Sequence, residues 1–282
     1  MTARKLLGAL FLASLIAPLP AQDAPEVPAA DLPEAGAVIE KMIEALGGRE
    51  AMAKVSSRRS DGKFAMPAQG MTATYTEWNG GKGKFRLILD LPPFGKMEQG
   101  VTGDVVWESN PMTGGTIQEG EMAKMQKRTA RLWPILHTKE DYKSIDTIAR
   151  ETVDGKECIV ILAIDADDNE EKWFIDGATH LRVKTTATIE APMVGKISMT
   201  TTESDWREVE GLKFAFKTTI DQSIQKIEIQ VESVQLNPET PEGTFSLPPQ
   251  VQKMVDKKKA AEEAAEPAEG GAVAEPPGGG GR

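Results

Sequence analysis

The side chains best suited to chemistry in this chain are two histidines, one cysteine and one acidic run. His137 and His180 are far apart, and neither belongs to a zinc-binding spacing such as H-E-x-x-H. His180 follows a turn sequence, which favours a solvated ring. Cys158 stands in a strand-like pattern, which favours a buried, inert thiol over a nucleophile. Because the G-x-S-x-G, Walker and Rossmann motifs are all absent, we expect a protein that is not an enzyme and has no cofactor.

The acidic run at residues 165–171 raises the question of a calcium site. Its sequence, Asp-Ala-Asp-Asp-Asn-Glu-Glu, lacks the glycine at the sixth position that an EF-hand loop needs. The glutamate at the twelfth position of such a loop is missing too. A solvated hairpin loop is therefore the favoured interpretation, and no metal is expected.

Methionine and tryptophan side chains form a more informative group. Each one by itself is best explained as ordinary core. A strongly curved sheet, however, has a concave face too wide for its own side chains to fill, and methionine adapts to varied apolar partners. Together they predict an apolar cavity completed by helices or by a ligand; the group comprises Met97, Trp107, Met112, Met122, Met125, Trp133 and Trp173.

One amphipathic helix precedes the strands. Asp31 is the expected N-cap, with Glu34 three positions later completing a capping box. Gly47 and Gly48 are expected to end the helix. Its apolar face recurs at helical spacing and comprises Ala35, Val38, Ile39, Met42, Ile43 and Leu46.

From residue 57 onward the apolar period changes to two, which is typical of half-buried antiparallel strands. The clearest alternations are at residues 85–91, 212–217 and 227–232. Hairpin turns are expected at residues 79–82, 154–155 and 176–177. About ten or eleven strands at this spacing predict a mainly β (α+β) fold: one strongly curved antiparallel sheet, or half-barrel.

Two segments depart from simple alternation. Residues 158–164 are apolar on both faces, which predicts a central strand with helix or lid above it. Residues 119–132 show helical spacing, with Met122, Met125, Thr129 and Leu132 on one stripe and Pro134 after it. The opposite face carries Lys124, Lys127, Arg128 and Arg131. We expect this helix to lie across the concave side of the sheet.

The two ends of the chain differ from the middle. Residues 1–21 have a basic start, a short apolar run and a small residue for cleavage, as in a secretory signal peptide. Residues 22–30 read as a linker, residues 31–247 as the folded domain and residues 248–282 as a low-complexity, disordered tail. With Cys158 as the only cysteine, neither an internal disulfide nor a lipid anchor at the cleavage site is expected. A net charge of -10 argues against nucleic acid as a partner.

Several short motifs resemble one known family. Gly103-Asp104 and Trp107, followed by Asn110-Pro111, resemble the D-G-x-x-x-W-x-x-N-P step of LolA-like proteins, with the first pair in reversed order. Trp173 and Asp176, followed by Leu181, resemble their W-x-x-D-x-x-x-x-L hairpin. Residues 205–213 resemble their D-Y-R-x-V-D-G-V-K step. The resemblance covers about residues 35–247 and is carried by these motifs together.

This resemblance to the outer-membrane lipoprotein-sorting family implies a half-barrel with helices over its open side, enclosing a cavity for acyl chains. The lid helix and the strands are then expected to supply the lining. Arg86, by its place in the family's strand motif, is expected to meet a polar headgroup or to latch the lid; an exposed strand arginine is an equal alternative. The expected cavity residues are Phe85, Leu87, Leu89, Trp107, Met122, Met125, Leu132 and Trp133.

The resulting expectation is an exported periplasmic protein that binds a lipid or the acyl chains of a lipoprotein. Membrane-bound delivery or receptor proteins are the expected partners, and the mature chain is expected to have no transmembrane segment. One alternative is a periplasmic regulator that uses the same fold to bind a protein partner, of the kind that acts with an anti-sigma factor. A hydrolase with an unrecognised constellation ranks third.

Overall fold

One continuous antiparallel sheet dominates the protein. The computed structural model describes residues 31–191, 195–222 and 225–265. The expected signal peptide at 1–21 and linker at 22–30 lie outside these residues. Thirteen strands pair in the order β6-β5-β4-β3-β2-β1-β13-β12-β11-β10-β9-β8-β7. The strands are β1 Arg58–Met66, β2 Met71–Gly81, β3 Lys84–Leu91, β4 Gly95–Thr102, β5 Val105–Asn110, β6 Gly114–Gln118, β7 Tyr142–Val153, β8 Lys156–Asp165, β9 Glu170–Asp176, β10 Arg182–Ala191, β11 Gly195–Val209, β12 Leu212–Asp221 and β13 Lys226–Leu236.

The sheet consists of two meanders joined through one long-range pair. Strands β1 to β6 follow one another on one side, strands β7 to β13 on the other, and β1 pairs with β13 at the junction. The mainly β prediction with a single antiparallel sheet is confirmed, but the expected ten or eleven strands were too few. Strands such as β6 (Gly-Gly-Thr-Ile-Gln) explain the shortfall, since glycines and a single large apolar residue give almost no alternating pattern.

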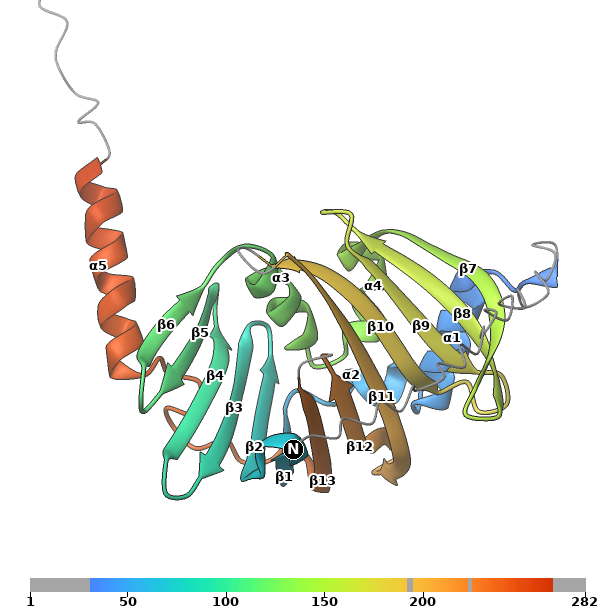
Figure 1. The fold of residues 1–282 in the computed structure, drawn as a ribbon, viewed down its shortest axis with the longest axis horizontal. Coiled ribbons are helices and arrows are strands. Elements are labelled where there is room, and N and C mark those ends of the chain that lie inside the picture. The colour runs from blue at the N-terminus through green and yellow to red at the C-terminus, as the bar shows by residue number, and fades with distance from the viewer. Residues whose placement is uncertain (1–30, 192–194, 223–224, 266–282) are drawn as a thin grey trace, which may run out of the picture.

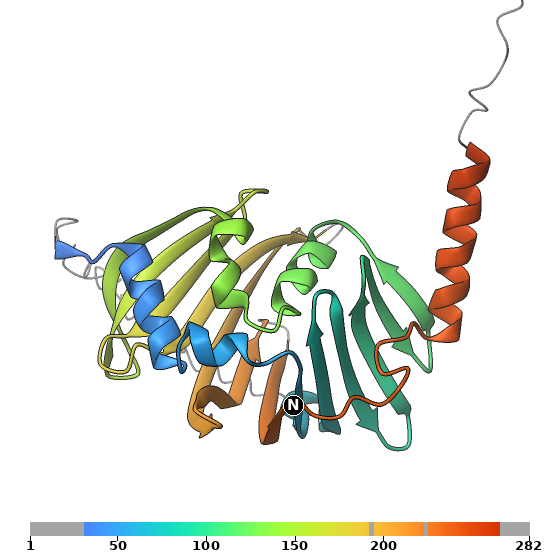
Figure 2. The ribbon, with the colours of Figure 1, turned by 180° about the vertical axis from the view of Figure 1, so that it is seen from behind.

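Helices cover one face of the curved sheet, which we call the inner face (Figures 1 and 2). Between β6 and β7 the chain forms three short helical segments, and α1 and α2 precede β1. Among the described residues, no helix is both long enough and apolar enough to span a membrane. The helical segments are α1 Ala35–Ala45, α2 Arg49–Ala53, η2 Pro67–Gln69, α3 Gly120–Thr129, η3 Pro134–His137, α4 Thr138–Asp141 and α5 Pro249–Ala265.

Helix α1 confirms the expected apolar face but begins later than predicted. Its buried side chains Val38, Ile39, Met42 and Ile43 pack onto the inner face of β8, β9 and β12. The N-cap is Glu34, without a side-chain cap hydrogen bond, so the capping box from Asp31 is wrong. The predicted C-terminus is correct, because the Gly48 amide donates to the Ile43 carbonyl at 2.8 Å. Gly47 has φ +117°, and a Cβ there would lie 2.3 Å from the Gly211 carbonyl oxygen.

The predicted alternations fall in β3, β12 and β13, and two of the predicted turns are where expected. Asp154-Gly155 joins β7 to β8, and Asp176-Gly177 follows β9. The first hairpin turns later than predicted, because β2 continues through Gly81 and the turn falls at Lys82-Gly83.

Strand β8 is buried on both faces, as its composition predicts, but it is not central. Ile159 and Ile161 lie in the inner core with α1. Cys158 and Val160 face outward and pack with Phe174. Because β8 is the neighbour of the edge strand β7, its outer face is covered by side chains of adjacent strands and by no described helix.

The helix predicted at residues 119–132 exists but is shorter, and one residue of its predicted inward stripe is exposed. Helix α3 ends at Thr129, and Pro134 begins the next segment, η3. Its buried side chain is Ala123, which packs with Phe85. Met122, predicted on the inward stripe, is 41 % exposed. The spacing of the apolar residues was enough to identify the helix. It did not identify the face that packs on the sheet, because alanine, which makes that contact, contributes little to an apolar pattern.

The C-terminal segment is ordered further than expected. Residues 249–265, within the predicted disordered tail, form helix α5 beside the edge strand β6 (Figure 1). Val251 is fully buried at this contact, and a Cβ on Gly115 would lie 2.9 Å from its methyl group. Lys258 pairs with Glu119 at 2.5 Å. An Ala-, Glu- and Lys-rich sequence has high helix propensity, and the Val251 contact, the Lys258 ion pair and a hydrogen bond of 2.6 Å from Gln250 to Ser109 hold the helix at this edge.

Candidate functional site

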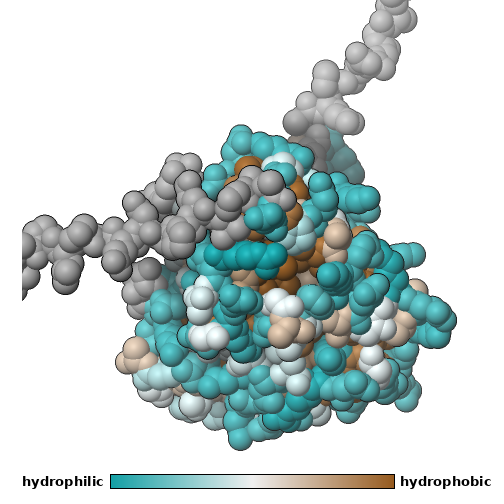
Figure 3. Space-filling model, turned by 90° about the vertical axis from the view of Figure 1, so that its right-hand side faces the viewer, coloured by the Kyte–Doolittle hydropathy of each residue, from teal (hydrophilic) through white to brown (hydrophobic). Residues whose placement is uncertain are grey.

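A cavity of about 500 Å³ lies between the inner face of the sheet and helices α1, α3, η3 and α4. Met42 of α1 and its C-cap residue Leu46 border it on one side, and Met125 of α3 on another. Phe214, Ile229 and Val231 contribute from the sheet. In the space-filling view, hydrophobic residues reach the surface near the middle of one face, surrounded by hydrophilic ones (Figure 3).

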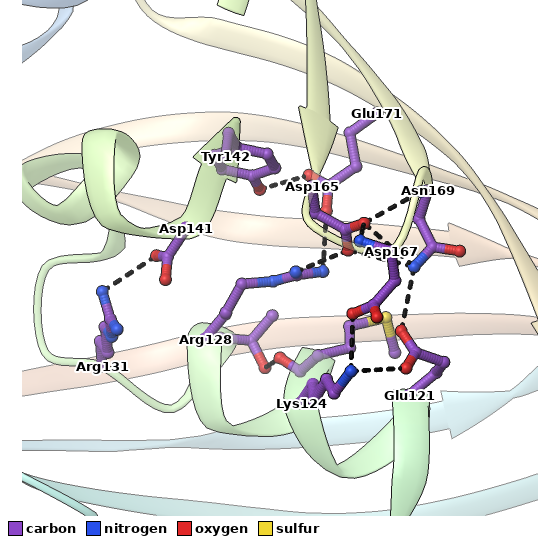
Figure 4. Close-up of polar contacts among 12 residues, drawn as sticks. Glu121, Lys124, Arg128, Arg131, Asp141, Tyr142, Asp165, Asp167, Asn169 and Glu171 are labelled. Atoms are coloured by element: carbon purple, nitrogen blue, oxygen red, sulfur yellow. Dashed lines mark hydrogen bonds and ion pairs between the residues drawn. The ribbon is translucent and has the colours of Figure 1, made fainter. Parts of the chain in front are cut away.

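Helix α3 is held in place over this cavity by polar contacts at the turn between β8 and β9 (Figure 4). Arg128 donates to Asp165 at 2.7 Å and lies 3.8 Å from Glu171. Lys124 bonds Asp167 at 2.7 Å. Burial disfavours the charged form of Asp165, but hydrogen bonds from Arg128 and Asn169 outweigh it and lower the pKa. The contact is therefore between full charges at neutral pH.

The acidic turn at residues 165–171 is more ordered than a solvated loop. The Asp165 carboxylate accepts hydrogen bonds from the backbone amides of Asp167 and Asn169, at 3.0 and 2.9 Å. Carboxylate oxygens of Glu121, Asp165 and Asp167 lie within 4.8 Å of one another. Arg128 pairs with Asp165, and Lys124 pairs with both Asp167 and Glu121, so the cluster is explained as an anchor for α3.

The cavity wall also contains arginine–glutamate pairs on the inner face of the sheet. Arg182 makes a two-pronged contact to Glu203, with N–O distances of 2.8 and 2.9 Å. Arg58 pairs with Glu77. The attraction of Glu203 raises the pKa of Arg182, which remains charged.

Two tyrosines complete this polar part of the wall. Tyr142 donates to Glu171 at 2.9 Å, and Tyr75 donates to Glu77. Burial, followed by the nearby glutamate, raises the pKa of each phenol. Both phenols therefore stay neutral and act as hydrogen-bond donors.

Three of the predicted cavity residues line the cavity: Met125, Leu132 and Trp133. Trp133 is fixed by a hydrogen bond of 3.1 Å from its Nε1 to the Met52 carbonyl and by a contact with Phe214, whose ring centroid is 5.8 Å away.

Three more predicted residues, Phe85, Leu87 and Leu89, face inward but lie beside the cavity. Phe85 packs against Ala123 and Ala130. Leu87 and Leu89 join the cluster around Tyr75 and Leu91. These strand residues support α3 and the sheet, and they are not among the side chains that border the cavity.

Trp107, predicted among the cavity residues, lies on the outer face of the sheet, and so does Arg86. Because side chains alternate along a strand, and Phe85 faces α3, Arg86 must point outward. Arg86 is opposite Gly100, and Gly100 is opposite Trp107, so both share the outer face. Arg86 lies over the Trp107 ring and donates to the Thr244 carbonyl at 3.0 Å. It therefore holds the segment after β13, and it does not latch α3.

Sequence reasoning missed the charged pairs of the wall. The alternation of side chains along β2 could have revealed them. Glu77 stands between Tyr75 and Asn79, and all three side chains point to the inner face of the sheet. A charged residue in the inward phase indicates a partner or a polar ligand. His180 was also misassigned, because it borders the cavity and its Nδ1 is buried instead of solvated.

The fold and cavity define a class of protein: a single curved antiparallel sheet with helices packed on its inner face around an internal space. No family model matches the chain, and no curated protein matches it in sequence.

Solved structures do match the fold. The chain is similar to a putative outer membrane lipoprotein-sorting protein domain from Vibrio parahaemolyticus, with 13% identity and a TM-score of 0.54 over 75% of this chain and 97% of that one. A LolA superfamily protein from Nitrosomonas europaea has 12% identity and a TM-score of 0.52 over 76% and 98%. A DUF1329 family protein from Desulfovibrio piger has 10% identity and a TM-score of 0.55 over 75% and 97%. The fold predicted from the family resemblance is confirmed at this level.

Proposed function

We propose that this chain is an exported periplasmic protein that binds a lipid, or the acyl chains of a lipoprotein, in the cavity beneath α3. It would act in outer-membrane lipoprotein sorting or lipid trafficking, as a binding protein and not as an enzyme. The observation that carries the proposal is the cavity itself. Its volume, about 500 Å³, falls within the roughly 300–1,000 Å³ typical of small-molecule sites.

The energy available from an acyl chain suits a reversible carrier. Each buried methylene contributes ~0.8 kcal/mol, so about ten of them give roughly 8 kcal/mol. That gross value corresponds to a dissociation constant on the order of 1 μM, before the cost of ordering is subtracted. Binding of this strength allows both capture and release.

We further propose that α3 is the movable lid. The buried side chains Ala123 and Ala130 remove little apolar surface from water when the helix packs. Its other attachments are polar and include the ion pairs of Lys124, Lys127 and Arg128 and the hydrogen bonds from Asn79 and Asn169. Gly120, with φ +67°, and Pro134 stand near its two ends as natural pivot points. Opening would therefore exchange polar contacts with water and leave most of the core intact.

The test compares two methionines of the same helix. Binding of the uncharged dye N-phenyl-1-naphthylamine should be saturable in the natural protein and strongly reduced by Met125→Asp, which places a charge in the cavity. Met122→Asp, at a position 41 % exposed, should leave binding unchanged. Native mass spectrometry of the purified protein should show co-purified lipid. Absence of both lipid and saturable dye binding would overturn the proposal. The regulatory alternative stays a prediction, to be tested by capture of a membrane-bound partner.

A further inference from the structure

The two edges of the sheet are protected in different ways. Strand β7, at one edge, has irregularities in its pairing between Tyr142 and Ser144 and between Thr147 and Ala149. It also carries exposed charged side chains, which are Lys143, Asp146, Arg150 and Glu151. Bulges and charges are common features that prevent an edge strand from pairing with another chain. Strand β7 is therefore a poor template for an added strand.

Strand β6, at the opposite edge, has neither kind of protection. Its sequence, Gly-Gly-Thr-Ile-Gln, contains no charged residue, and it pairs with β5 in one continuous register. Helix α5 lies along its free side instead (Figures 1 and 2). In the part of the chain that the structure describes, no backbone hydrogen bond joins α5 to β6. The helix therefore shields the outward N–H and C=O groups of β6 without pairing with them.

Side-chain contacts hold α5 at this edge. Val251 is fully buried in the contact, and Gln250 donates to the Ser109 hydroxyl at 2.6 Å. The ion pair of Lys258 with Glu119 joins side chains that are 54% and 67% exposed. Water competes for such surface contacts, so they contribute little to the attachment. The burial of one valine is then the main barrier to the release of α5.

The segment that precedes α5 is anchored separately on the outer face of the sheet. Arg86 donates to the Thr244 carbonyl at 3.0 Å. Thr102 donates to the Phe245 carbonyl at 2.9 Å. The Phe245 ring lies on Gly80, where a Cβ would be 3.0 Å from the ring. Helix α5 can therefore leave β6 while the segment before it stays in place.

We propose that α5 is a removable cover for the β6 edge, and that β6 pairs with the β6 strand of a second copy of this chain when α5 is displaced. The pairing is antiparallel and related by a twofold axis, so the same strand serves both copies and the assembly closes as a dimer. Pairing of β6 with β7 would instead continue into a fibre, and the bulges and charges of β7 oppose it. The edge of a second copy is uncharged as well, so the two strands meet without repulsion. This inference is independent of the proposed lipid binding.

The test uses the full chain with Val251→Asp and Lys258→Glu together. The first change places a carboxylate in the buried contact, and the second turns the ion pair with Glu119 into a repulsion. Limited proteolysis near residue 250 reports whether α5 has detached. Sedimentation equilibrium at rising protein concentration then reports the mass. The natural chain should remain a monomer, and the double variant should approach twice the monomer mass.

A third change tests whether β6 forms the dimer contact. Thr116→Lys, added to the double variant, should restore the monomer, because Thr116 is the middle residue of β6 and like charges would face each other across the pair. Thr113→Lys, in the exposed turn before β6, is the matched control and should leave the dimer intact. Equal masses of the natural chain and the double variant would overturn the inference. So would an α5 that stays attached, a dimer that survives Thr116→Lys, or an equal loss of the dimer with Thr113→Lys.

Discussion

Arg128 and Asp165 join helix α3 to the far half of the sheet, with Nη1 and Oδ2 2.7 Å apart. Two residues further on, the Ala130 carbonyl accepts a hydrogen bond of 2.9 Å from Asn79 of β2. Seven strand-to-strand steps separate β2 from β8, which at about 4.8 Å per step would span roughly 34 Å in a flat sheet. Contacts made by residues 128 and 130 can connect these strands only because the sheet is strongly bent. Helix α3 therefore bridges the two meanders.

Asn79→Ala should loosen α3 without unfolding the sheet. The Asn79 side chain is buried, and its loss leaves the Ala130 carbonyl without this donor, at a cost of about 1–3 kcal/mol. Hydrogen–deuterium exchange should show faster exchange over residues 120–130. Asn110→Ala, which removes only a turn contact to the Met112 amide, is the control. Unchanged exchange in α3 would mean that this hydrogen bond does not hold the helix.

Asp165→Asn should destabilise the protein at neutral pH and much less in acid. The folded-state pKa of Asp165 is lowered, because its hydrogen bonds outweigh the opposing effect of burial. The contribution of its charge is thus present above the unfolded carboxyl pKa of about 3.9 and is lost as pH falls through the lower folded value. Urea denaturation at pH 7 should show a loss of about 1–3 kcal/mol that shrinks at pH 3.

The matched control for this pH experiment is Asp168→Asn in the same turn. Asp168 is 85% exposed in its side chain, and its pair with Lys143 is a surface contact worth about 0–1 kcal/mol. A pH-independent loss at Asp165, or an equal pH-dependent loss at Asp168, would contradict the assigned role of the buried charge.

Cys158 should be unreactive until the protein unfolds. The thiol is buried on the outer face of β8, and burial raises its pKa, so little thiolate forms near neutrality. Labelling with an aromatic disulfide at pH 8 should be about a thousand-fold slower in the native protein than in urea. A Cys158→Ala variant carrying Thr113→Cys, in an exposed turn, should label rapidly under native conditions. Fast native labelling of Cys158 would show that this face opens locally.

Val251→Asp should detach helix α5 from β6. Val251 is fully buried against Gly115, so a carboxylate there would lose its hydration. Limited proteolysis should then cleave near residue 250 and leave the sheet domain intact. Met254→Asp, on the same helix but 41 % exposed, should not change the cleavage rate. Equal resistance of both variants would show that other contacts hold α5.

Sequence alone predicted the elements whose evidence is local. The α1 face, the alternation at Phe85 and the Asp154-Gly155 turn depend on residues a few positions apart, so their patterns survive in the printed chain. The start of α1 was misplaced because a capping sequence at Asp31 is only a weak local preference.

The cavity residues were predicted less well for a geometric reason. Leu132 and Trp133 follow α3 directly, and the helical pattern brought them to the correct side. Trp107 is in a strand whose two faces carry similar side chains, so alternation could not show which face points inward. Only the pairing of Trp107 with Gly100, and of Gly100 with Arg86, decides which face of the sheet Trp107 occupies. A register shift of one residue would move every side chain of the strand to the opposite face.

The sequence by itself determined which secondary-structure elements form: a meander of alternating strands, one amphipathic helix before it and one short helix within it. What only the tertiary structure decided is how β1 and β13, the first and last strands of the chain, pair in the middle of the sheet and join its two halves. That pairing sets Arg58 beside Phe214, and the bend of the joined sheet brings Arg128 to Asp165. Contacts between residues this far apart leave no periodic signal in the chain, because they depend on the register and curvature of many strands together.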